Sequence, residues 1–245
     1  MMKSLLLAVT LLACATAAQA VELVTNGDFE QTLTAGSKEF GSRFPSQQLT
    51  GWATDGYNFV FQSGTADTTG ANGEYGGLQL WGPGNGVANG LPAASPTGGN
   101  YVAADGAFSV DSIRQTITGL QPGMAATLTF YWAGAQQQGF NGVTTEQWQV
   151  SLGSETQSTA VVTNADHGFT GWVQQTFTFT PTSSTAVLSF LAIGTPNGEP
   201  PFSLLDGVSL QQDTVPEPAA WAMLVTGFGV VGLAMRRRSL TSVAA

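Results

Sequence analysis

Short stretches of this 245-residue chain alternate between apolar and polar residues with a period of two. The pattern is plainest in residues 127–132, 147–152 and 172–179. A period of two places successive side chains on opposite faces of a β-strand, and no window sustains the 3.6-residue period of a helix. Turn-forming residues separate the stretches. We therefore predict an all-β fold, a jelly-roll β-sandwich, with strands near residues 22–30, 57–62, 77–81, 100–105, 110–118, 125–133, 146–152, 159–163, 171–180, 185–193 and 203–211.

Alternation also predicts which aromatic residues are buried. Trp132 shares its parity with Leu128 and Phe130, and Trp148 shares its parity with Val150. We expect both tryptophans to lie in the core, because residues of one parity point to one face of a strand. The opposite, polar parity, rich in Thr and Gln, carries three further aromatic residues, namely Trp81, Tyr131 and Trp172.

These three aromatic residues are candidate glycan contacts. The apolar faces of sugars stack on aromatic rings, and their hydroxyl groups bond to Gln, Asn, Asp and Thr side chains. In the alternative interpretation, Thr and Gln are ordinary solvent-facing strand residues and the aromatic rings cap the edges of the sheet. Exposed Thr-rich strands can equally carry glycans themselves.

The first twenty residues have the pattern of a secretory signal peptide. Lys3 precedes a short apolar run, and Ala18 and Ala20 form a small-x-small cleavage site. The mature chain is then expected to begin at Val21. A competing interpretation is a lipoprotein box that ends at Cys14 and leaves this residue lipidated.

The last thirty residues are patterned differently. A breaker at residues 214–218 precedes an uncharged stretch, residues 219–235, and three arginines follow it. The stretch is at the short end of the length that spans a membrane, and an Arg cluster is retained on the cytoplasmic side. We predict a transmembrane segment at 219–235, a cytoplasmic tail at 239–245 and a β domain at 21–213 that lies outside. The alternative, a buried C-terminal helix, would have to end in three consecutive arginines.

The order of these C-terminal features resembles the PEP-CTERM sorting signal. The resemblance implies that an exosortase, a membrane-embedded transpeptidase, recognises the tripeptide Pro216, Glu217 and Pro218. It also implies a Gram-negative host that secretes exopolysaccharide, and export to the cell envelope, the cell surface or the exterior. The matching residues are Pro216, Glu217, Pro218, Arg236, Arg237 and Arg238.

Charge and cysteine content narrow the function classes. The whole chain has a formal net charge of −9, and only 9% of its residues are charged. Residues 21–213 hold three basic residues against fifteen acidic ones, which leaves a net charge of −12. A nucleic-acid-binding protein needs a basic face, which this balance excludes. The single cysteine, Cys14, lies in the predicted leader and can form neither a disulfide framework nor a cysteine-based zinc site.

A second resemblance covers residues 22–211. The sequences LVTNGDFE at 23–30, TGW at 50–52, GNYV at 99–102, SIRQTI at 112–117 and FSLLDGVSL at 202–210 are similar, in this order, to galactose-binding-like domains, which include carbohydrate-binding modules and DUF642-like proteins. In such modules a calcium ion often joins the first strand to the last. The matching positions here are Glu30 and Asp206. The alternative is that Glu30 is a surface residue and Asp206 a turn former before Gly207.

No group of residues in the sequence converges on a reaction. His167 is the only histidine and lies in a turn-like segment. The sequence contains no Gly-x-Ser-x-Gly nucleophile elbow whose serine this histidine could activate. We therefore expect a non-enzymatic protein of the extracellular matrix or biofilm that binds exopolysaccharide. The alternatives are a structural, glycosylated surface protein without glycan binding and, less favoured, a glycosidase that uses two carboxylates.

Overall fold

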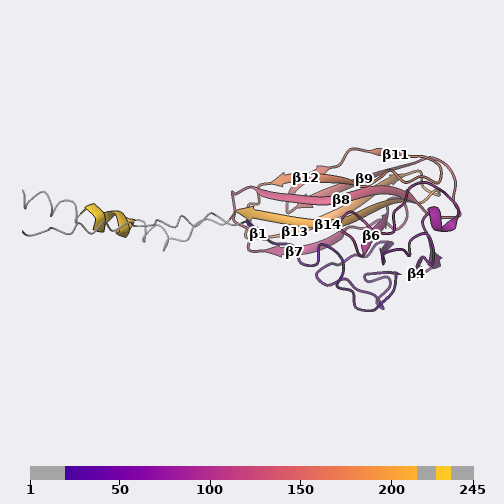
Figure 1. The fold of residues 1–245 in the computed structure, drawn as a ribbon, viewed down its shortest axis with the longest axis horizontal. Coiled ribbons are helices and arrows are strands. Elements are labelled where there is room, and N and C mark those ends of the chain that lie inside the picture. The colour runs from indigo at the N-terminus through magenta and orange to yellow at the C-terminus, as the bar shows by residue number, and fades with distance from the viewer. Residues whose placement is uncertain (1–19, 214–224, 233–245) are drawn as a thin grey trace, which may run out of the picture. The chain divides into compact units, whose positions relative to one another are not determined.

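The computed structural model describes residues 20–213 and 225–232. The chain divides into two compact units. One unit is Val21–Gln212 and the other combines the two chain ends. The first unit is a β-sandwich of two sheets (Figure 1). The predicted two-sheet architecture is confirmed.

The larger sheet has nine strands. Its two longest strands, β8 (Ala126–Gln136) and β14 (Pro201–Asp213), pair antiparallel, whereas the short strands β2 (Lys38–Glu39) and β4 (Ala71–Gly73) pair in parallel. In spatial order the strands are β12 (Val173–Phe179), β8 (Ala126–Gln136), β14 (Pro201–Asp213), β6 (Tyr101–Asp105), β3 (Asn58–Phe61), β2 (Lys38–Glu39), β4 (Ala71–Gly73) and β5 (Gly76–Leu78), with β1 (Ala20–Glu22) beside β14.

The smaller sheet has five antiparallel strands. They are β10 (Glu155–Ser158), β9 (Thr144–Leu152), β13 (Thr185–Thr195) and β7 (Ile113–Thr118), with β11 (Val162–Asn164) also paired to β9. A short 3₁₀ helix, η1 (Pro83–Asn85), lies in the connection between β5 and β6.

The core between the sheets follows the predicted alternation. Trp132 and Trp148 are 2% and 0% exposed, and both belong to the large cluster of buried side chains that joins the two sheets. The indole of Trp148 donates a hydrogen bond to the carbonyl of Leu204 at 3.1 Å and packs edge-on against Phe190. Burial of large apolar side chains of this kind provides most of the favourable free energy of folding.

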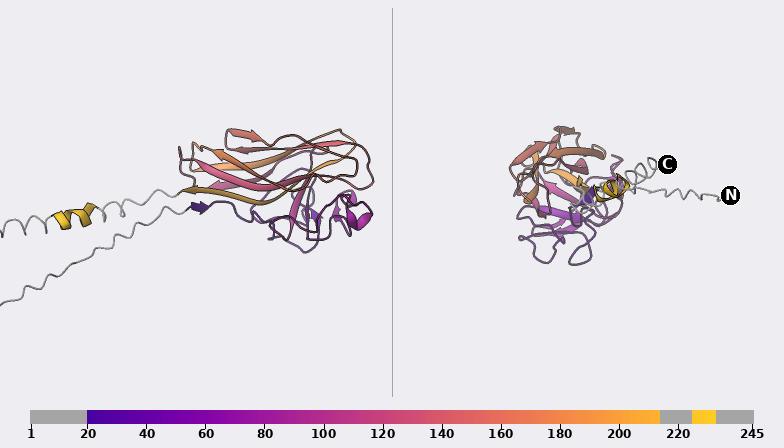
Figure 2. Two further views of the ribbon diagram at one scale, coloured as in Figure 1. Left: turned by 45° about the horizontal axis from the view of Figure 1, so that its top comes forward. Right: turned by 90° about the vertical axis from the view of Figure 1, so that its left-hand side faces the viewer.

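The outer face of the larger sheet differs from the sequence expectation. A second hydrophobic cluster lies there, and its sheet residues include Phe59, Phe61, Tyr101 and Phe202. Residues 62–100 contribute Ala66, Leu78, Leu80 and Leu91 to the same cluster. Figure 2 shows the segment that precedes β6, coloured indigo to magenta, against one side of the strand layers. Strands β3 and β6 are consequently buried on both faces.

The predicted strand at 22–30 is wrong beyond its first residues. Only Ala20–Glu22 form a strand, and Asn26 and Phe29 have φ values of 53° and 54°, which interrupt an extended conformation. The segment nevertheless runs beside the last strand. The Leu23 amide donates to the Leu210 carbonyl at 2.9 Å. A β-carbon at Gly27 would lie 1.9 Å from the Val208 carbonyl oxygen, so only glycine fits there. The short strands β2, β4 and β10 are absent from the prediction.

Residues 225–232 form a short helix. Within the described parts of the chain, no helix is both long and apolar enough to cross a membrane. Several predicted features lie outside the described residues. They are residues 1–19 of the leader predicted at 1–20, with Cys14, the rest of segment 219–235, the sorting residues 216–218 and 236–238, and the tail at 239–245.

Candidate functional site

Trp81, Tyr131 and Trp172 do not form one exposed binding platform. All three are half-buried, and no ring contact joins any two of them. The alternation correctly places Tyr131 and Trp172 opposite the inter-sheet core, but the second hydrophobic cluster covers this face. Trp172 packs edge-on against Tyr101, with ring centroids 5.5 Å apart, and its buried indole nitrogen has no hydrogen-bond partner. Trp172 is therefore a packing residue at the border of that cluster.

Trp81 lies at the end of the sandwich where β8 ends. Its indole donates to the Phe140 carbonyl at 2.9 Å, and its ring centroid lies 4.2 Å from that of His167. His167 has a φ of 58° and lies in a turn, as predicted, where Nε2 contacts the side-chain oxygen of Asn141 at 2.7 Å. These contacts hold the turn at residues 137–142 in place.

A pocket that the sequence reasoning missed lies beside this turn. Strand register brings several chain segments together here, because Phe202 pairs with Asp105 and Pro201 pairs with Gln136. The turns after β6 and β8 and before β14 therefore meet at one end of the sandwich. They enclose a pocket of about 270 Å³, which is lined by Tyr57, Tyr75, Asp105, Ala107, Phe108, Gln137, Phe140, Asn197, Gly198 and Pro200.

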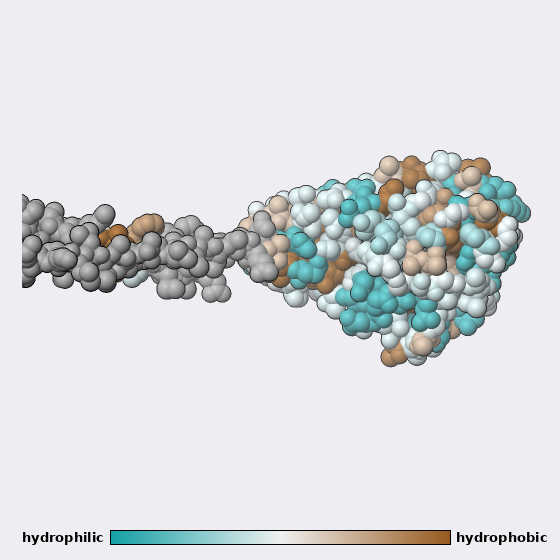
Figure 3. Space-filling model, viewed as in Figure 1, coloured by the Kyte–Doolittle hydropathy of each residue, from teal (hydrophilic) through white to brown (hydrophobic). Residues whose placement is uncertain are grey.

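Three aromatic rings form one wall of the pocket. The centroids of Tyr57 and Tyr75 are 5.8 Å apart, those of Tyr57 and Phe108 are 5.4 Å apart, and those of Tyr75 and Phe108 are 5.7 Å apart. Tyr57 is 7% exposed, whereas Tyr75 and Phe108 are 62% and 42% exposed. On the face shown in Figure 3, most hydrophobic residues are scattered and do not form one large patch. Adjacent exposed rings around a hollow are the kind of surface that binds a ligand.

The carboxylate of Asp105 lies beneath this wall and is 2% exposed. Its Oδ1 accepts hydrogen bonds from the amides of Ala107 and Phe108, at 2.8 and 3.0 Å, which fixes the turn that carries Phe108. Its Oδ2 is buried without a partner. Burial raises the pKa of Asp105 to about 6, although the two backbone hydrogen bonds oppose the shift. Burial also raises the pKa of Tyr57 to about 12, and the nearby charges of Glu39 and Asp105 add to this shift.

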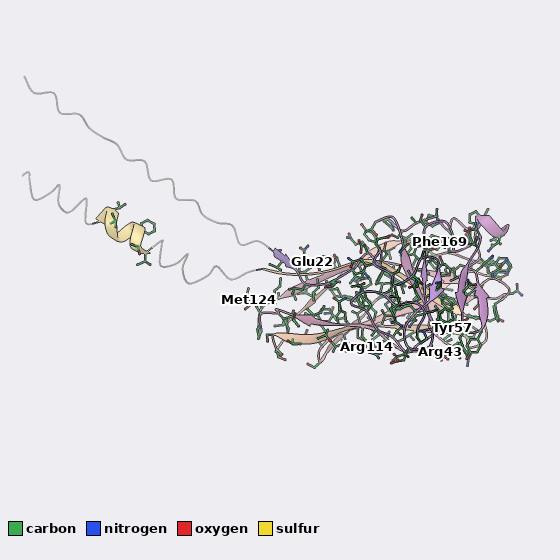
Figure 4. The ribbon with its side chains drawn as sticks, turned by 90° about the horizontal axis from the view of Figure 1, so that it is seen from below. Glu22, Arg43, Tyr57, Arg114, Met124 and Phe169 are labelled. Carbon is green, nitrogen blue, oxygen red and sulfur yellow. The ribbon has the colours of Figure 1, made fainter. Side chains whose placement is uncertain are left out.

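An ion-pair network holds Tyr75 against the other rings. Nη2 of Arg43 lies 2.6 Å from Glu74 and donates to the Tyr75 hydroxyl at 3.1 Å. The Arg43 guanidinium carbon also lies 5.8 Å from the centroid of the Tyr75 ring. Glu39, which is fully buried, accepts the Glu74 amide at 2.7 Å and lies 3.4 Å from Nε of Arg43. Arg43 and Tyr57 are labelled close together in Figure 4, far from Met124 and Glu22.

The predicted metal residues, Glu30 and Asp206, come within electrostatic reach of each other. Asp206 is fully buried, its Oδ2 accepts the hydroxyls of Ser95 and Thr97, and its Oδ1 has no partner. Burial raises the pKa of Asp206 to about 6, and the charge of Glu30 contributes a smaller part of the increase. Glu30 accepts the Asn100 amide at 2.5 Å.

This arrangement fits a hard cation such as Ca²⁺, which takes carboxylate, hydroxyl and carbonyl oxygens. The unpartnered Oδ1 of Asp206 is the observation that supports the fit. The described part of the chain contains no cluster of three or more His, Cys, Asp or Glu side chains. Hydroxyl and backbone carbonyl oxygens would therefore have to complete the coordination.

Comparison with known families gives one match. Residues 93–211 match a family model described as "Protein of unknown function (DUF642)". The DUF642 resemblance seen in the sequence is thereby confirmed for this segment. The segment includes Asp105, Phe108, Phe140 and Asp206 but begins after Tyr57 and Tyr75. The pocket is therefore lined by residues inside and outside the DUF642 match. No curated protein matches the chain.

Three solved structures illustrate the similarities that were found. The K3 cleaved adhesin domain of Lys-gingipain from Porphyromonas gingivalis is 15% identical, with a TM-score of 0.42 over 79% of this chain and 99% of that domain. A carbohydrate-binding module, TmCBM61, in complex with β-1,4-galactotriose is 14% identical, with a TM-score of 0.39 over 79% and 99%. The CBM22-1 xylan-binding domain of Paenibacillus barcinonensis Xyn10C is 10% identical, with a TM-score of 0.35 over 75% and 100%.

Proposed function

We propose that this protein is an exported, non-enzymatic surface or matrix protein that binds exopolysaccharide through the pocket of Tyr57, Tyr75 and Phe108. The single observation that carries the proposal is this group of rings, two of them exposed, around a hollow with a buried carboxylate. Rings of this kind offer apolar faces for sugars to stack on. We assign the glycan contact to these residues in place of Trp81, Tyr131 and Trp172. Trp81 contacts a turn, and Trp172 packs against Tyr101.

The position of the pocket suits a surface protein. The pocket lies at the end of the sandwich where β14 begins, and the chain leaves the domain at the other end of β14, at Asp213. The pocket and the point at which the chain leaves the domain are therefore at opposite ends of β14.

The sorting route completes the proposal. Its support is the sequence of residues 215–238, which resembles a PEP-CTERM signal with Pro216, Glu217 and Pro218 as the exosortase recognition site. The β domain, of jelly-roll type, would then act in the biofilm of a Gram-negative host. We further propose that Ca²⁺ binds at Asp206 and Glu30 as a structural ion, because the buried carboxylate there has an unused oxygen.

The binding test uses the purified domain and the polysaccharide of the host, measured by pull-down and titration. The Tyr75→Ala and Phe108→Ala double variant is expected to lose affinity at least about tenfold, since central aromatic contacts dominate binding energies. Leu33→Ala is the matched control, because Leu33 is 64% exposed and does not line the pocket. Both proteins should melt within a few degrees of the wild type.

Three results would redirect the proposal. Unchanged affinity in the double variant would show that the pocket does not bind the polysaccharide. Absence of binding to any polysaccharide would favour a structural, glycosylated surface protein. Release of sugars from the polymer would favour the glycosidase alternative.

A further inference from the structure

We propose that the pocket recognises a sugar residue with a free ammonium group, such as a de-N-acetylated amino sugar in a polysaccharide. This inference rests on the proposed function and specifies the ligand of the same site. It is carried by the pairing of three aromatic rings with the unpartnered Asp105 carboxylate beneath them.

The three rings form a packed cluster beside the pocket. Tyr57, Tyr75 and Phe108 are mutually tilted by 56° to 89°, and no two of them stack in parallel. Their centroids are 5.4 to 5.8 Å apart, so the rings contact one another and a ligand would lie against the exposed Tyr75 and Phe108, not between the rings. The negative faces of aromatic rings attract ammonium groups within about 6 Å of their centroids.

The position of Asp105 favours a charged ligand over a neutral one. Its Oδ2 is closed to water, so a sugar hydroxyl at the pocket does not reach it without movement of the rings. A hydrogen bond requires direct contact. A Coulomb attraction acts over several ångströms and is stronger in a poorly hydrated site. The buried carboxylate therefore distinguishes a cation from a neutral sugar even without contact.

Positive charge near the pocket is already neutralised. No Lys, Arg or His lines it, and the nearest cation, Arg43, is bound to Glu39 and Glu74. Elsewhere on the domain, Arg114 is bound to Asp55 and Asp111. With a net charge of −12 over residues 21–213, the domain attracts polycations and repels anionic polysaccharides such as uronic acid polymers.

The test compares trimers of glucosamine and of N-acetylglucosamine, titrated into the domain at pH 7 and moderate salt. We expect the glucosamine trimer to bind at least about tenfold more tightly, from cation–π and Coulomb attraction together. Asp105→Asn keeps the Oδ1 acceptor for Ala107 and Phe108 but removes the charge, so it should reduce this preference to the part that the aromatic rings supply. Asp28→Asn is the control, because Asp28 is exposed, does not line the pocket and has the same formal charge.

A second measurement needs no variant. Lowering the pH from 7 to 5 protonates Asp105, whose pKa is about 6, whereas the sugar amines lose no charge and gain further protons. The preference of the wild type for the glucosamine trimer should then fall. Tyr57 interacts with the charge of Asp105 and also with Glu39, Tyr75 and Arg43, and burial raises the pKa of Glu39 as well. A preference lowered in Asp105→Asn as well as on acidification would assign the effect to Asp105.

Two outcomes would overturn the inference. Equal binding of both trimers, lost in Tyr75→Ala, would leave the proposed function intact but exclude ammonium recognition. If Asp28→Asn and Asp105→Asn lower the preference for the glucosamine trimer equally, that preference comes from general attraction by an acidic domain and not from Asp105. Binding that is insensitive to Tyr75→Ala would instead contradict the proposed function itself.

Discussion

The two faces of the larger sheet are both covered, but by different means. A second sheet covers the inner face, so regular rows of side chains meet and close the core around Trp148. Segment 62–100, which consists mostly of turns together with the short strands β4 and β5, covers the outer face over Phe61 and Tyr101. At the margin of this cover, Tyr75 of the segment and Phe108 remain exposed around a pocket. A regular cover seals a face, whereas a cover made of turns leaves aromatic residues accessible at its margin, where a ligand can bind.

The largest expected effect tests the sealed face. Trp148→Ala should lower the free energy of unfolding by about 3–5 kcal/mol, because a fully buried ring is lost and a cavity remains. Leu80→Ala, on the outer face, should cost nearer the lower end of the range of about 2–5 kcal/mol for buried leucines, since irregular segments relax more easily. Urea denaturation measures both. A larger loss of unfolding free energy for Leu80→Ala than for Trp148→Ala would contradict the expectation that the inner face contributes more to stability.

A buried carboxylate at the end of the inner face gives the next effect. Burial raises the pKa of Glu146 to about 7, against an ordinary value of 4.5, although a hydrogen bond from Thr144 opposes the shift. The folded state therefore holds an extra proton between these two values, and stability falls as the pH rises through them. Glu146→Gln carries no such charge. It should match the wild type at pH 4.5 and exceed it by about 2–4 kcal/mol at pH 8.

Urea denaturation measures the free energy of unfolding of Glu146→Gln and of the wild type at each pH. Other carboxylates titrate in both proteins, so their contribution cancels in the difference between the two free energies. The control is Gln147→Glu, which adds a carboxylate at a half-exposed position of the same strand and shows what a charge on β9 does where it is not buried. A constant difference between Glu146→Gln and wild type from pH 4.5 to pH 8 would contradict the assigned pKa.

The smallest effect concerns the attachment of the outer cover. Asp206 points to the outer face and binds the hydroxyls of Ser95 and Thr97, which belong to the covering segment. If Ca²⁺ binds there, saturating calcium should raise the free energy of unfolding by about 2–3 kcal/mol, in proportion to the logarithm of its concentration over its Kd. Thermal melting with calcium and with chelator measures the effect, and Glu30→Gln should reduce it. Identical melting curves would exclude a structural calcium ion.

Much of the inner face could be predicted from sequence because its residues obey one local rule. Side chains of equal parity in a strand share a face, so the burial of Leu128, Phe130, Trp132 and Trp148 follows from alternation alone. The rule does not say what lies on the other face. It therefore placed Trp172 on the side opposite the inter-sheet core but did not indicate the second cluster, against which Trp172 is half-buried.

The pocket had only a weak signal in the sequence. Tyr75 lies between glycines at residues 73–77, and Phe108 follows Gly106, so both are aromatic residues within turns. Aromatic residues in glycine-rich turns have no neighbouring sheet to pack against and often remain exposed. This signal marks the two residues individually, but it does not indicate that they meet, since they are 33 positions apart in the chain.

The sequence by itself determined the strand periodicity, the inter-sheet core, the acidic character of the domain and the similarity of residues 93–211 to the DUF642 model. These properties depend on composition and on neighbours along the chain. Only the tertiary structure decided that a second cluster covers the outer face, that Asp105 lies buried beneath Tyr57, Tyr75 and Phe108, and that Asp206 anchors the covering segment. These features depend on strand register and on contacts between distant segments, which no local pattern encodes.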